Sequence, residues 1–288
     1  MVEGLWQPLV LGGVAGSCGE LIAQPMIVVR TRMMVQGVAA AGGMVRYSGF
    51  LDTCRTMLRT EGLRAFYKGA AVNAAFTPAC RALYMGGLEL SKATIGGGTA
   101  ARDFLAGTSA QLIGSLAYVP RDIIIERCAI DGQLKTQVGS CQSSLHALRT
   151  MLAHEGLWGF YRAYVPHQFV WIPYNGLFFA LLGKLEALEA RAGLPRDALA
   201  LGVANSAVCA AAAGWATTPI DVIKTRVQVQ GANPQLFDFV GPLDCVRQLV
   251  RCEGPTALFS GSVGRMLYLV PNMAIFLPLY EYLKRVAA

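Results

Sequence analysis

The sequence predicts an all-α membrane protein that consists of three copies of one helical unit. Of its 288 residues, 54% are hydrophobic and only 15% are charged, whereas about 25% are charged in an average soluble domain. A proline motif occurs three times, starting at Pro25, Pro120 and Pro219. A Glu-Gly motif follows each copy, starting at Glu61, Glu155 and Glu253. Both motifs return after 94 to 99 residues, and this shared period indicates a repeated structural unit.

Each unit contains two apolar stretches that are long enough to cross a bilayer. About 20 helical residues, with a rise of about 1.5 Å each, span a hydrocarbon core about 30 Å thick. The predicted transmembrane helices cover residues 5–29, 72–90, 104–125, 164–185, 198–223 and 263–283. The alternative is six core helices of a soluble protein, but so few charged residues could not cover a soluble surface. The three units are then residues 1–98, 99–193 and 194–288.

A short amphipathic helix is predicted between the two spans of each unit. These helices cover residues 50–60, 142–154 and 239–252. The first of them has apolar residues at helical spacing, namely Leu51, Cys54, Met57 and Leu58. Arg55 and Arg59 lie on its other side. A helix of this kind lies along the membrane surface. The glycine of the Glu-Gly motif is expected to end it.

The net charge of +7 is concentrated in the segments that follow the first span of each unit. In the first unit these basic residues are Arg30, Arg32, Arg46, Arg55, Arg59, Arg64 and Lys68. Positive residues remain on the side from which helices insert, so the three long loops should share one face and both termini the other. The basic face suits anionic lipids of the cardiolipin type. Nucleic-acid binding is not expected, because the basic residues are divided among three apolar units.

No catalytic or metal-binding pattern accompanies the repeats. The sequence lacks a glycine-rich phosphate loop and a Ser-His-Asp order in a suitable context, and its eight cysteines show no paired metal-ligand spacing. We therefore expect no enzyme activity, no cofactor and no metal site. No cleavable signal segment is recognisable, so targeting information is expected inside the mature chain.

Charged residues follow each proline of the first motif. A proline inside a helix removes one hydrogen bond and kinks the helix, so three matched kinks would turn these charges toward a common axis. The acid two residues after the proline and the base five residues after it lie on adjacent helix faces, so the acid of one unit can reach the base of the next. Charges at this depth mark function or pairing. The alternative, interfacial charges that face water, leaves their threefold repetition unexplained.

With these motifs the chain resembles the mitochondrial carrier family over its whole length. The resemblance rests on all six motif copies, such as Pro219-Ile-Asp221-Val-Ile-Lys224. It implies a six-helix barrel with threefold pseudosymmetry, in which networks of ion pairs close a water-filled cavity on one side and then on the other. It also implies a monomeric multi-pass transporter of a small-molecule substrate. Its place would be the mitochondrial inner membrane, with both termini facing the intermembrane space.

The resemblance assigns the residues after the prolines to a gate on the matrix side. The residues concerned are Pro25, Pro120 and Pro219 and the pairs Asp122 with Lys224 and Asp221 with Arg30. The third pair departs from the family, because Ile27 stands at its acidic position and Ile125 at its basic position. Replacing both members of a buried pair can be nearly neutral, whereas losing one strands a buried charge. We therefore expect a gate of two ion pairs and one isoleucine contact.

The family's second network lies on the second span of each unit, twenty residues after the glycine that closes the Glu-Gly motif. The count gives Glu89 and Lys92 in the first unit, and Glu281 and Lys284 in the third. In the second unit the count falls on Gly183 and Glu186, which breaks the pattern. The gate on the cytoplasmic side is therefore expected to be incomplete, which would make the cytoplasm-open state easier to reach.

The family's substrate contacts fall on uncharged residues in this chain. They are Phe76 and Thr77, Val170 and Trp171, and Tyr268 and Leu269. Carriers of nucleotides, phosphate or keto acids would be expected to place arginine here, so such anions are disfavoured. One turn further along, the chain has Arg81, Asn175 and Met273. In the first span Glu20 interrupts an apolar run five residues before Pro25.

An acid, a base and an apolar wall suit a zwitterion with a hydrophobic side chain. Glu20 would bind its amine and Arg81 its carboxylate; the alternative is that Arg81 neutralises Glu20. The segment 78–92 and the residues around Trp171 resemble carriers of branched-chain amino acids. A proton-leak (uncoupling) carrier, a mitoferrin-like carrier and an S-adenosylmethionine-like carrier are the other candidates. The iron carrier is disfavoured, because all three histidines, including His167, are expected on or beside the loop side.

Overall fold

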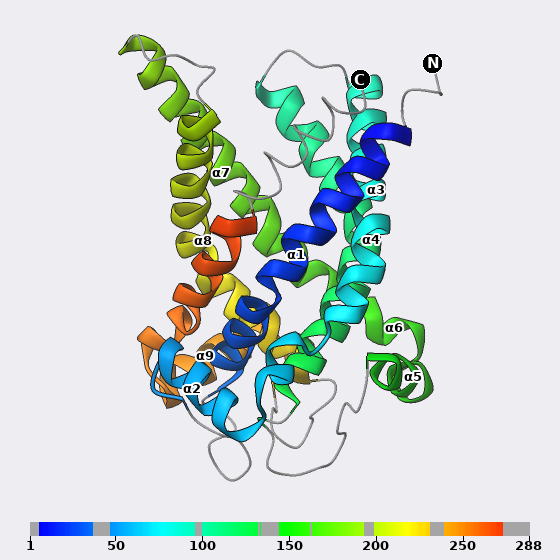
Figure 1. Cartoon of the computed structure of the whole chain (residues 1–288), viewed down its shortest axis with the longest axis vertical. Helices are drawn as coiled ribbons and strands as arrows, with labels where there is room; N and C mark the ends of the chain where they lie inside the picture. Colours follow the sequence, from blue (N-terminus) through cyan, green and yellow to red (C-terminus); the bar gives the residue numbers. More distant parts are fainter. Residues whose placement is uncertain are drawn as a thin grey trace.

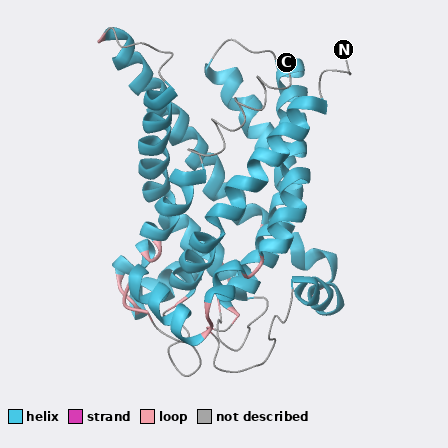
Figure 2. Cartoon of the chain, in the orientation of Figure 1, coloured by secondary structure: helices cyan, strands magenta, loops and turns pink. Residues whose placement is uncertain are grey.

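The computed structural model describes residues 6–36, 47–95, 100–131, 133, 144–161, 163–192, 199–230 and 239–272. Over these residues it contains helices and no strands (Figure 2). The long helices are α1 (Trp6–Val35), α3 (Ala70–Ile95), α4 (Ala100–Ile130), α7 (Tyr164–Arg191) and α8 (Leu199–Gln230). A helical stretch over residues 262–272 begins where the last span was predicted. The all-α prediction is confirmed over the described residues.

The short helices gather at one end of the long ones, opposite the start of α1 (Figure 1). They are α2 (Phe50–Thr60), α5 (Ser144–His154) and α9 (Pro242–Cys252), each within three residues of its predicted bounds. A second short turn follows each of them, namely η2 (Leu63–Tyr67), α6 (Gly156–Tyr161) and η3 (Pro255–Phe259). The same succession of elements in each unit reproduces the repeat that the motifs predict.

The first long helix of each unit continues beyond its predicted end. The apolar runs predict ends at residues 29, 125 and 223, but α1, α4 and α8 end at Val35, Ile130 and Gln230. The additional turns contain polar residues such as Arg32 and Arg226, and both of these side chains are fully buried. Hydropathy missed these turns because packing against neighbouring helices, and not lipid, buries them.

The long helices expose apolar side chains and bury charged ones. Ile22, Val165 and Phe169 are each more than 60% exposed, whereas Glu20 and Lys224 are at most 3% exposed. A soluble protein shows the reverse distribution, and an apolar outer surface of this kind fits lipid. Within the described residues, one helix is long and apolar enough by itself to cross a membrane, over Leu201–Gln230.

An arginine–glutamate pair ties each short helix to the long helix before it. The pairs are Arg32 with Glu61, Arg127 with Glu155, and Arg226 with Glu253. Each guanidinium binds both carboxylate oxygens, for example Arg226 Nη1 and Nη2 at 2.7 and 3.0 Å from those of Glu253. The arginine ends the proline motif and the glutamate starts the Glu-Gly motif. The two repeated motifs are therefore the two halves of one contact.

Two of these arginines also bind the end of a long helix in another unit. Arg32 Nε donates to the carbonyl of Ala129 at 2.8 Å, and Arg226 Nε donates to that of Met34 at 2.9 Å. The last carbonyls of a helix have no partner within the helix, so these bonds satisfy them. The arginines thus fasten α1 to the end of α4, and α8 to the end of α1.

The second unit departs from the other two where its last long helix begins. Gly69 and Gly261 have φ angles of 83° and 82°, whereas Ala163 at the equivalent place has φ −98°. A Cβ on Gly261 would lie 3.1 Å from the carbonyl oxygen of Arg30, and one on Gly69 would lie 3.3 Å from Cα of Ile125. Glycine therefore permits close contact between units at these two places, as well as the left-handed backbone.

Replacing Glu253 by glutamine should lower the stability of the fold. Arg226 is fully buried and would lose its charged partner, and breaking a buried pair costs about 3–5 kcal/mol. Thermal unfolding in detergent measures the effect. Glu186→Gln, at an exposed position of α7, is the matched control and should leave the melting temperature unchanged. Equal melting temperatures for the two variants would show that the pair does not stabilise the fold.

The pair in the first unit should make stability depend on pH. Burial alone would raise the pKa of Glu61, but the hydrogen bonds and charges of Arg32 and Lys68 outweigh it and lower that pKa. A carboxylate of this kind stabilises the fold fully above its unfolded pKa of about 4.3, and its contribution is lost as the pH falls through the lower folded value.

Melting temperatures of the wild type and Glu61→Gln, measured from pH 7 downward, test this dependence. The wild type should be the more stable protein at pH 7, and the two curves should converge below a pH of about 4.3. Curves that stay parallel over the whole range would contradict this assignment.

Candidate functional site

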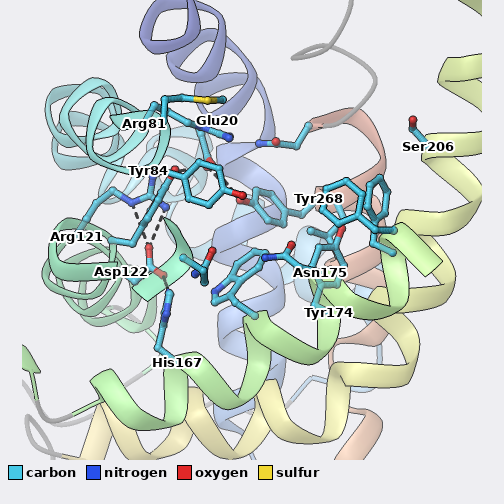
Figure 3. Close-up of a pocket in the computed structure, with 18 of the residues that line it drawn as sticks. Glu20, Arg81, Tyr84, Arg121, Asp122, His167, Tyr174, Asn175, Ser206 and Tyr268 are labelled. Atoms are coloured by element: carbon cyan, nitrogen blue, oxygen red, sulfur yellow. Dashed lines mark hydrogen bonds and ion pairs between the residues drawn. The ribbon is translucent and has the colours of Figure 1, made fainter. Parts of the chain in front are cut away.

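A cavity of about 310 Å³ lies between the long helices (Figure 3). Residues that the sequence predicted as substrate contacts line it, namely Glu20, Arg81, Trp171, Asn175 and Tyr268. They come from α1, α3, α7 and the helical stretch 262–272, so residues up to 248 positions apart meet at one site.

Phe76, Thr77 and Val170 were expected at the same site but are not among the described residues that line the cavity. Helix rotation explains Phe76: it lies five residues before Arg81 on α3, which turns it about 140° away, and its side chain is 37% exposed. Thr77 lies near the face of Arg81 but about 6 Å further along the axis. Its hydroxyl donates to the carbonyl of Asn73 at 2.6 Å and accepts from Arg121 at 3.1 Å.

Glu20 is buried against a neutral partner. The Tyr268 hydroxyl donates to the two carboxylate oxygens of Glu20 at 3.2 and 3.3 Å. The ion pair between Glu20 and Arg121 Nη1 is longer, at 3.9 Å. The guanidinium of Arg121 also lies over the ring of Tyr118, 4.9 Å from the centroid. Sequence reasoning missed Arg121, although a signal exists. It directly follows Pro120, where the other units have Met26 and Ile220.

A layer of buried charges lies further along the helices, toward the end where the short helices gather. We call this layer the charged floor; it consists of Arg30, Asp122, Glu126, Asp221, Lys224 and Arg265. Each is buried or half-buried. The floor begins close to Glu20, because the Arg30 guanidinium lies 5.1 Å from the ring centroid of Tyr268, whose hydroxyl donates to Glu20 at 3.2 Å.

The charged floor contains both ion pairs that the sequence predicted. Arg30 Nη1 lies 3.1 Å from Asp221 Oδ2, and Lys224 Nζ lies 3.6 Å from Asp122 Oδ2. In each pair, one residue also contacts a further charged side chain. Arg265 Nη1 is 2.9 Å from Asp221, and Glu126 Oε1 is 3.5 Å from Lys224. The expected set of two isolated pairs was therefore incomplete. The missing residues lie outside the family positions from which we counted.

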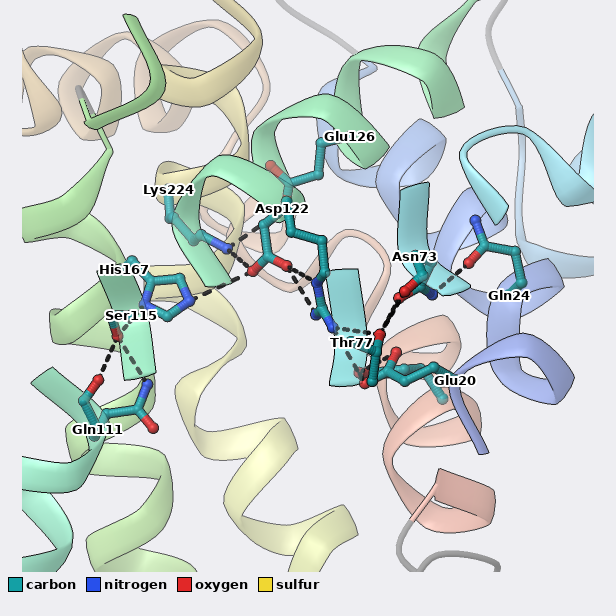
Figure 4. Close-up of polar contacts among 12 residues, drawn as sticks. Glu20, Gln24, Asn73, Thr77, Gln111, Ser115, Asp122, Glu126, His167 and Lys224 are labelled. Carbon is teal, nitrogen blue, oxygen red and sulfur yellow. Dashed lines mark hydrogen bonds and ion pairs between the residues drawn. The ribbon is translucent and has the colours of Figure 1, made fainter. Parts of the chain in front are cut away.

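Asp122 connects the charged floor to the cavity (Figure 4). Arg121 Nη2 approaches its carboxylate to 2.9 Å and His167 Nε2 to 3.4 Å, and His167 Nδ1 faces Ser115 Oγ at 3.4 Å. His167 lies one turn into α7, close to the end where the short helices gather, and its side chain is 1% exposed and lines the cavity.

The place of the third predicted pair is apolar. Ile27 and Ile125 are 6% and 3% exposed and belong to one cluster of buried hydrophobic residues. Neither helix therefore carries a stranded charge at this place. Among the described residues, no group of three metal-binding side chains is close enough to hold an ion.

The residues assigned to the second network are only partly described. Glu89 and Lys92 are exposed near the end of α3, and neither has an ion pair with any residue that the structure describes. Glu281 and Lys284 lie outside the described residues. Met273 also lies outside them.

Comparison with known proteins matches this architecture. The family described as mitochondrial carrier protein matches the chain in three segments, residues 2–99, 96–189 and 198–288. Mitochondrial substrate carrier family protein E of Dictyostelium discoideum is 28% identical over 96% of this chain and 94% of its own. Human solute carrier family 25 member 44 is 28% identical over 91% of this chain and 85% of its own. S-adenosylmethionine carrier 1, chloroplastic/mitochondrial, of Arabidopsis thaliana is 29% identical over 99% of this chain and 80% of its own.

The threefold match repeats the threefold pattern of the helices, and it covers almost the whole chain. Members of the matching family are membrane transporters and not enzymes, and membership implies the mitochondrial inner membrane. The cavity between the long helices and the charges beneath it suit a passage for a small molecule. The chain belongs to the mitochondrial carrier family.

Proposed function

We propose that the chain transports an amino acid or a related zwitterion across the mitochondrial inner membrane. The observation that carries this proposal is Glu20, a buried acid in a cavity that also contains two arginines, Arg81 and Arg121. Its hydrogen-bond donor is a neutral tyrosine, and its ion pair with Arg121 is long at 3.9 Å. An ammonium group would therefore bind Glu20 more closely than its present partners do.

The rest of the cavity fits the other parts of such a substrate. Arg81 and Asn175 would bind the carboxylate, with the arginine supplying the charge. The aromatic side chains of Trp171, Tyr174 and Phe178 line the wall and suit an apolar side chain. A volume of about 310 Å³ is at the small end of ligand sites, which favours a metabolite of amino-acid size.

The names of similar proteins support the same class. One relative is an S-adenosylmethionine carrier, and S-adenosylmethionine contains an amino acid group. Another, 30% identical over 96% of this chain, is an electrogenic aspartate/glutamate antiporter. A site for an ammonium and a carboxylate group is common to these substrates.

We further propose that the charged floor is the gate on the matrix side. Its ion pairs are formed, and it lies between the cavity and the short helices. Both termini would then face the intermembrane space, and the basic short-helix end would meet anionic lipid in the matrix leaflet. The cytoplasmic gate would contain Glu89, Lys92, Glu281 and Lys284. Closure by helix movements within one chain needs no second copy, so we propose a monomer.

Leucine should raise the melting temperature of the purified protein, because a ligand that binds only the folded state stabilises it. Glu20→Gln should weaken leucine binding about tenfold or more, since a hydrogen bond between charged groups contributes about 1.5–3 kcal/mol. Thermal-shift titration with leucine, S-adenosylmethionine, aspartate and ADP measures both effects. Glu186→Gln, exposed on α7, should behave as the wild type. A shift with ADP alone would show that the substrate is a multivalent anion.

A double-mutant cycle at the apolar place tests the gate. Ile27→Asp should impair transport, because it introduces a buried acid without a partner. Adding Ile125→Lys should restore much of the rate by completing a third ion pair. Uptake of radiolabelled substrate into liposomes measures each variant. Impairment without recovery in the double variant would argue against pairing between these two positions.

A further inference from the structure

Glu126 breaks the threefold repeat within the charged floor. It lies six residues after Pro120, and the equivalent residues after Pro25 and Pro219 are Thr31 and Thr225. The Thr31 hydroxyl donates to the carbonyl of Ile27 at 2.8 Å within its own helix. Threonine therefore suffices for the helix at this place. The second unit has gained a carboxyl group that the repeated architecture does not require.

Among the described residues, the only ion pair of the Glu126 carboxyl is with a cation that Asp122 also contacts. Its side chain is 3% exposed, and Lys224 Nζ lies 3.5 Å from Glu126 Oε1 and 3.6 Å from Asp122 Oδ2. Figure 4 shows the ammonium directed toward both carboxyl groups. Both distances exceed the about 2.7–2.9 Å of a strong charge-assisted hydrogen bond. One ammonium therefore serves two acids without binding either tightly.

The other charges around Glu126 are engaged elsewhere. Those facing it are Arg30 from α1, Asp122 from its own helix α4, and Asp221 and Lys224 from α8. Arg30 is bound to Asp221, which Arg265 also binds. Asp122 has Arg121 and His167 in addition to Lys224. An ionised Glu126 would thus be a buried anion beside two other anions, Asp122 and Asp221, and its nearest cation would be shared with Asp122. Burying a charge in such surroundings costs free energy.

Gln228 can satisfy Glu126 in either protonation state. With its amide nitrogen turned toward the carboxylate, it donates to Glu126 Oε1 at 3.3 Å. After a half-turn its amide oxygen faces the carboxyl instead and can accept the proton of the neutral acid. An amide is the side chain that serves both forms without leaving its place. This partner suits a carboxyl group that gains and loses a proton.

We infer that Glu126 is a proton-binding site of the closed charged floor and that it couples transport to protons. The site takes up one proton, forming an O–H bond on the carboxylate, while the floor is closed. When the floor opens toward the short helices, water from that side hydrates the carboxyl group, and the proton leaves into this water. Asp122 and His167 line the cavity and contact each other, and Asp122 lies 3.6 Å from Lys224, the neighbour of Glu126. This chain of polar groups provides the path by which the proton enters from the cavity. This inference rests on the proposed role of the floor as a gate.

Infrared difference spectroscopy of the purified protein tests the site without any substrate. At pH 6.5, where exposed glutamates with a pKa of about 4.3 are ionised, the wild type should show the C=O stretching band of a protonated carboxyl group. The band should be absent from Glu126→Gln and from Glu126→Thr, which restores the residue of the other units. Glu186→Gln should retain it. Absence of the band from the wild type, or its persistence in both Glu126 variants, would overturn the assignment.

Uptake of labelled leucine into liposomes tests the coupling. A pH gradient that is acidic on the cavity side should accelerate uptake several-fold in the wild type and in Glu126→Asp, which keeps a titratable group. Glu126→Thr should transport leucine without responding to the gradient. An equal response in Glu126→Thr, or none in the wild type, would overturn the coupling. If leucine is not transported at all, the proposed substrate fails, and the infrared band alone then decides whether Glu126 binds a proton.

Discussion

A charge inside a helical membrane protein is stable only beside a partner, because neither lipid nor the protein interior solvates it as water does. This constraint arranges the short helices. Arg32 and Arg226 are fully buried at the ends of α1 and α8, and the glutamates that neutralise them come from the segments after α2 and α9. The short helices therefore fold back onto the long ones, and the loops gather at one end (Figure 1). The same constraint is met at Ile27 and Ile125, because both residues are apolar and neither helix places a charge without a partner there.

The positions where the repeats differ carry the individual properties of this protein. Glu20 has Ser115 and Gly214 as its equivalents, so only the first unit supplies an acid to the cavity. Arg121 and Glu126 occur only in the second unit. The common positions build a threefold frame, and a symmetric frame cannot by itself distinguish one end of a substrate from the other. The unequal positions supply the cavity with the Glu20 carboxylate and the Arg121 guanidinium.

The cavity and the charged floor form one electrostatic unit. Asp122 belongs to both, because it lines the cavity and contacts Lys224 of the floor. Arg121 joins them a second time, since it pairs with Asp122 at 2.9 Å and reaches toward Glu20 at 3.9 Å. A ligand that draws Arg121 or the Glu20 side of the cavity to itself would change the charge beside Asp122. Binding in the cavity therefore has a direct physical route to the ion pairs of the charged floor.

The sequence by itself determined the threefold repeat and the order of the helices, because motif spacing and helix periodicity are local properties of the chain. It also identified the contacts Arg30–Asp221 and Asp122–Lys224, since the repeat relates these positions. Only the tertiary structure decided that Arg265 joins Asp221, that His167 lies in the cavity and that Phe76 does not. These outcomes depend on how each helix is rotated and how closely it approaches its neighbours. Contacts across the whole molecule set that rotation, and no segment encodes it alone.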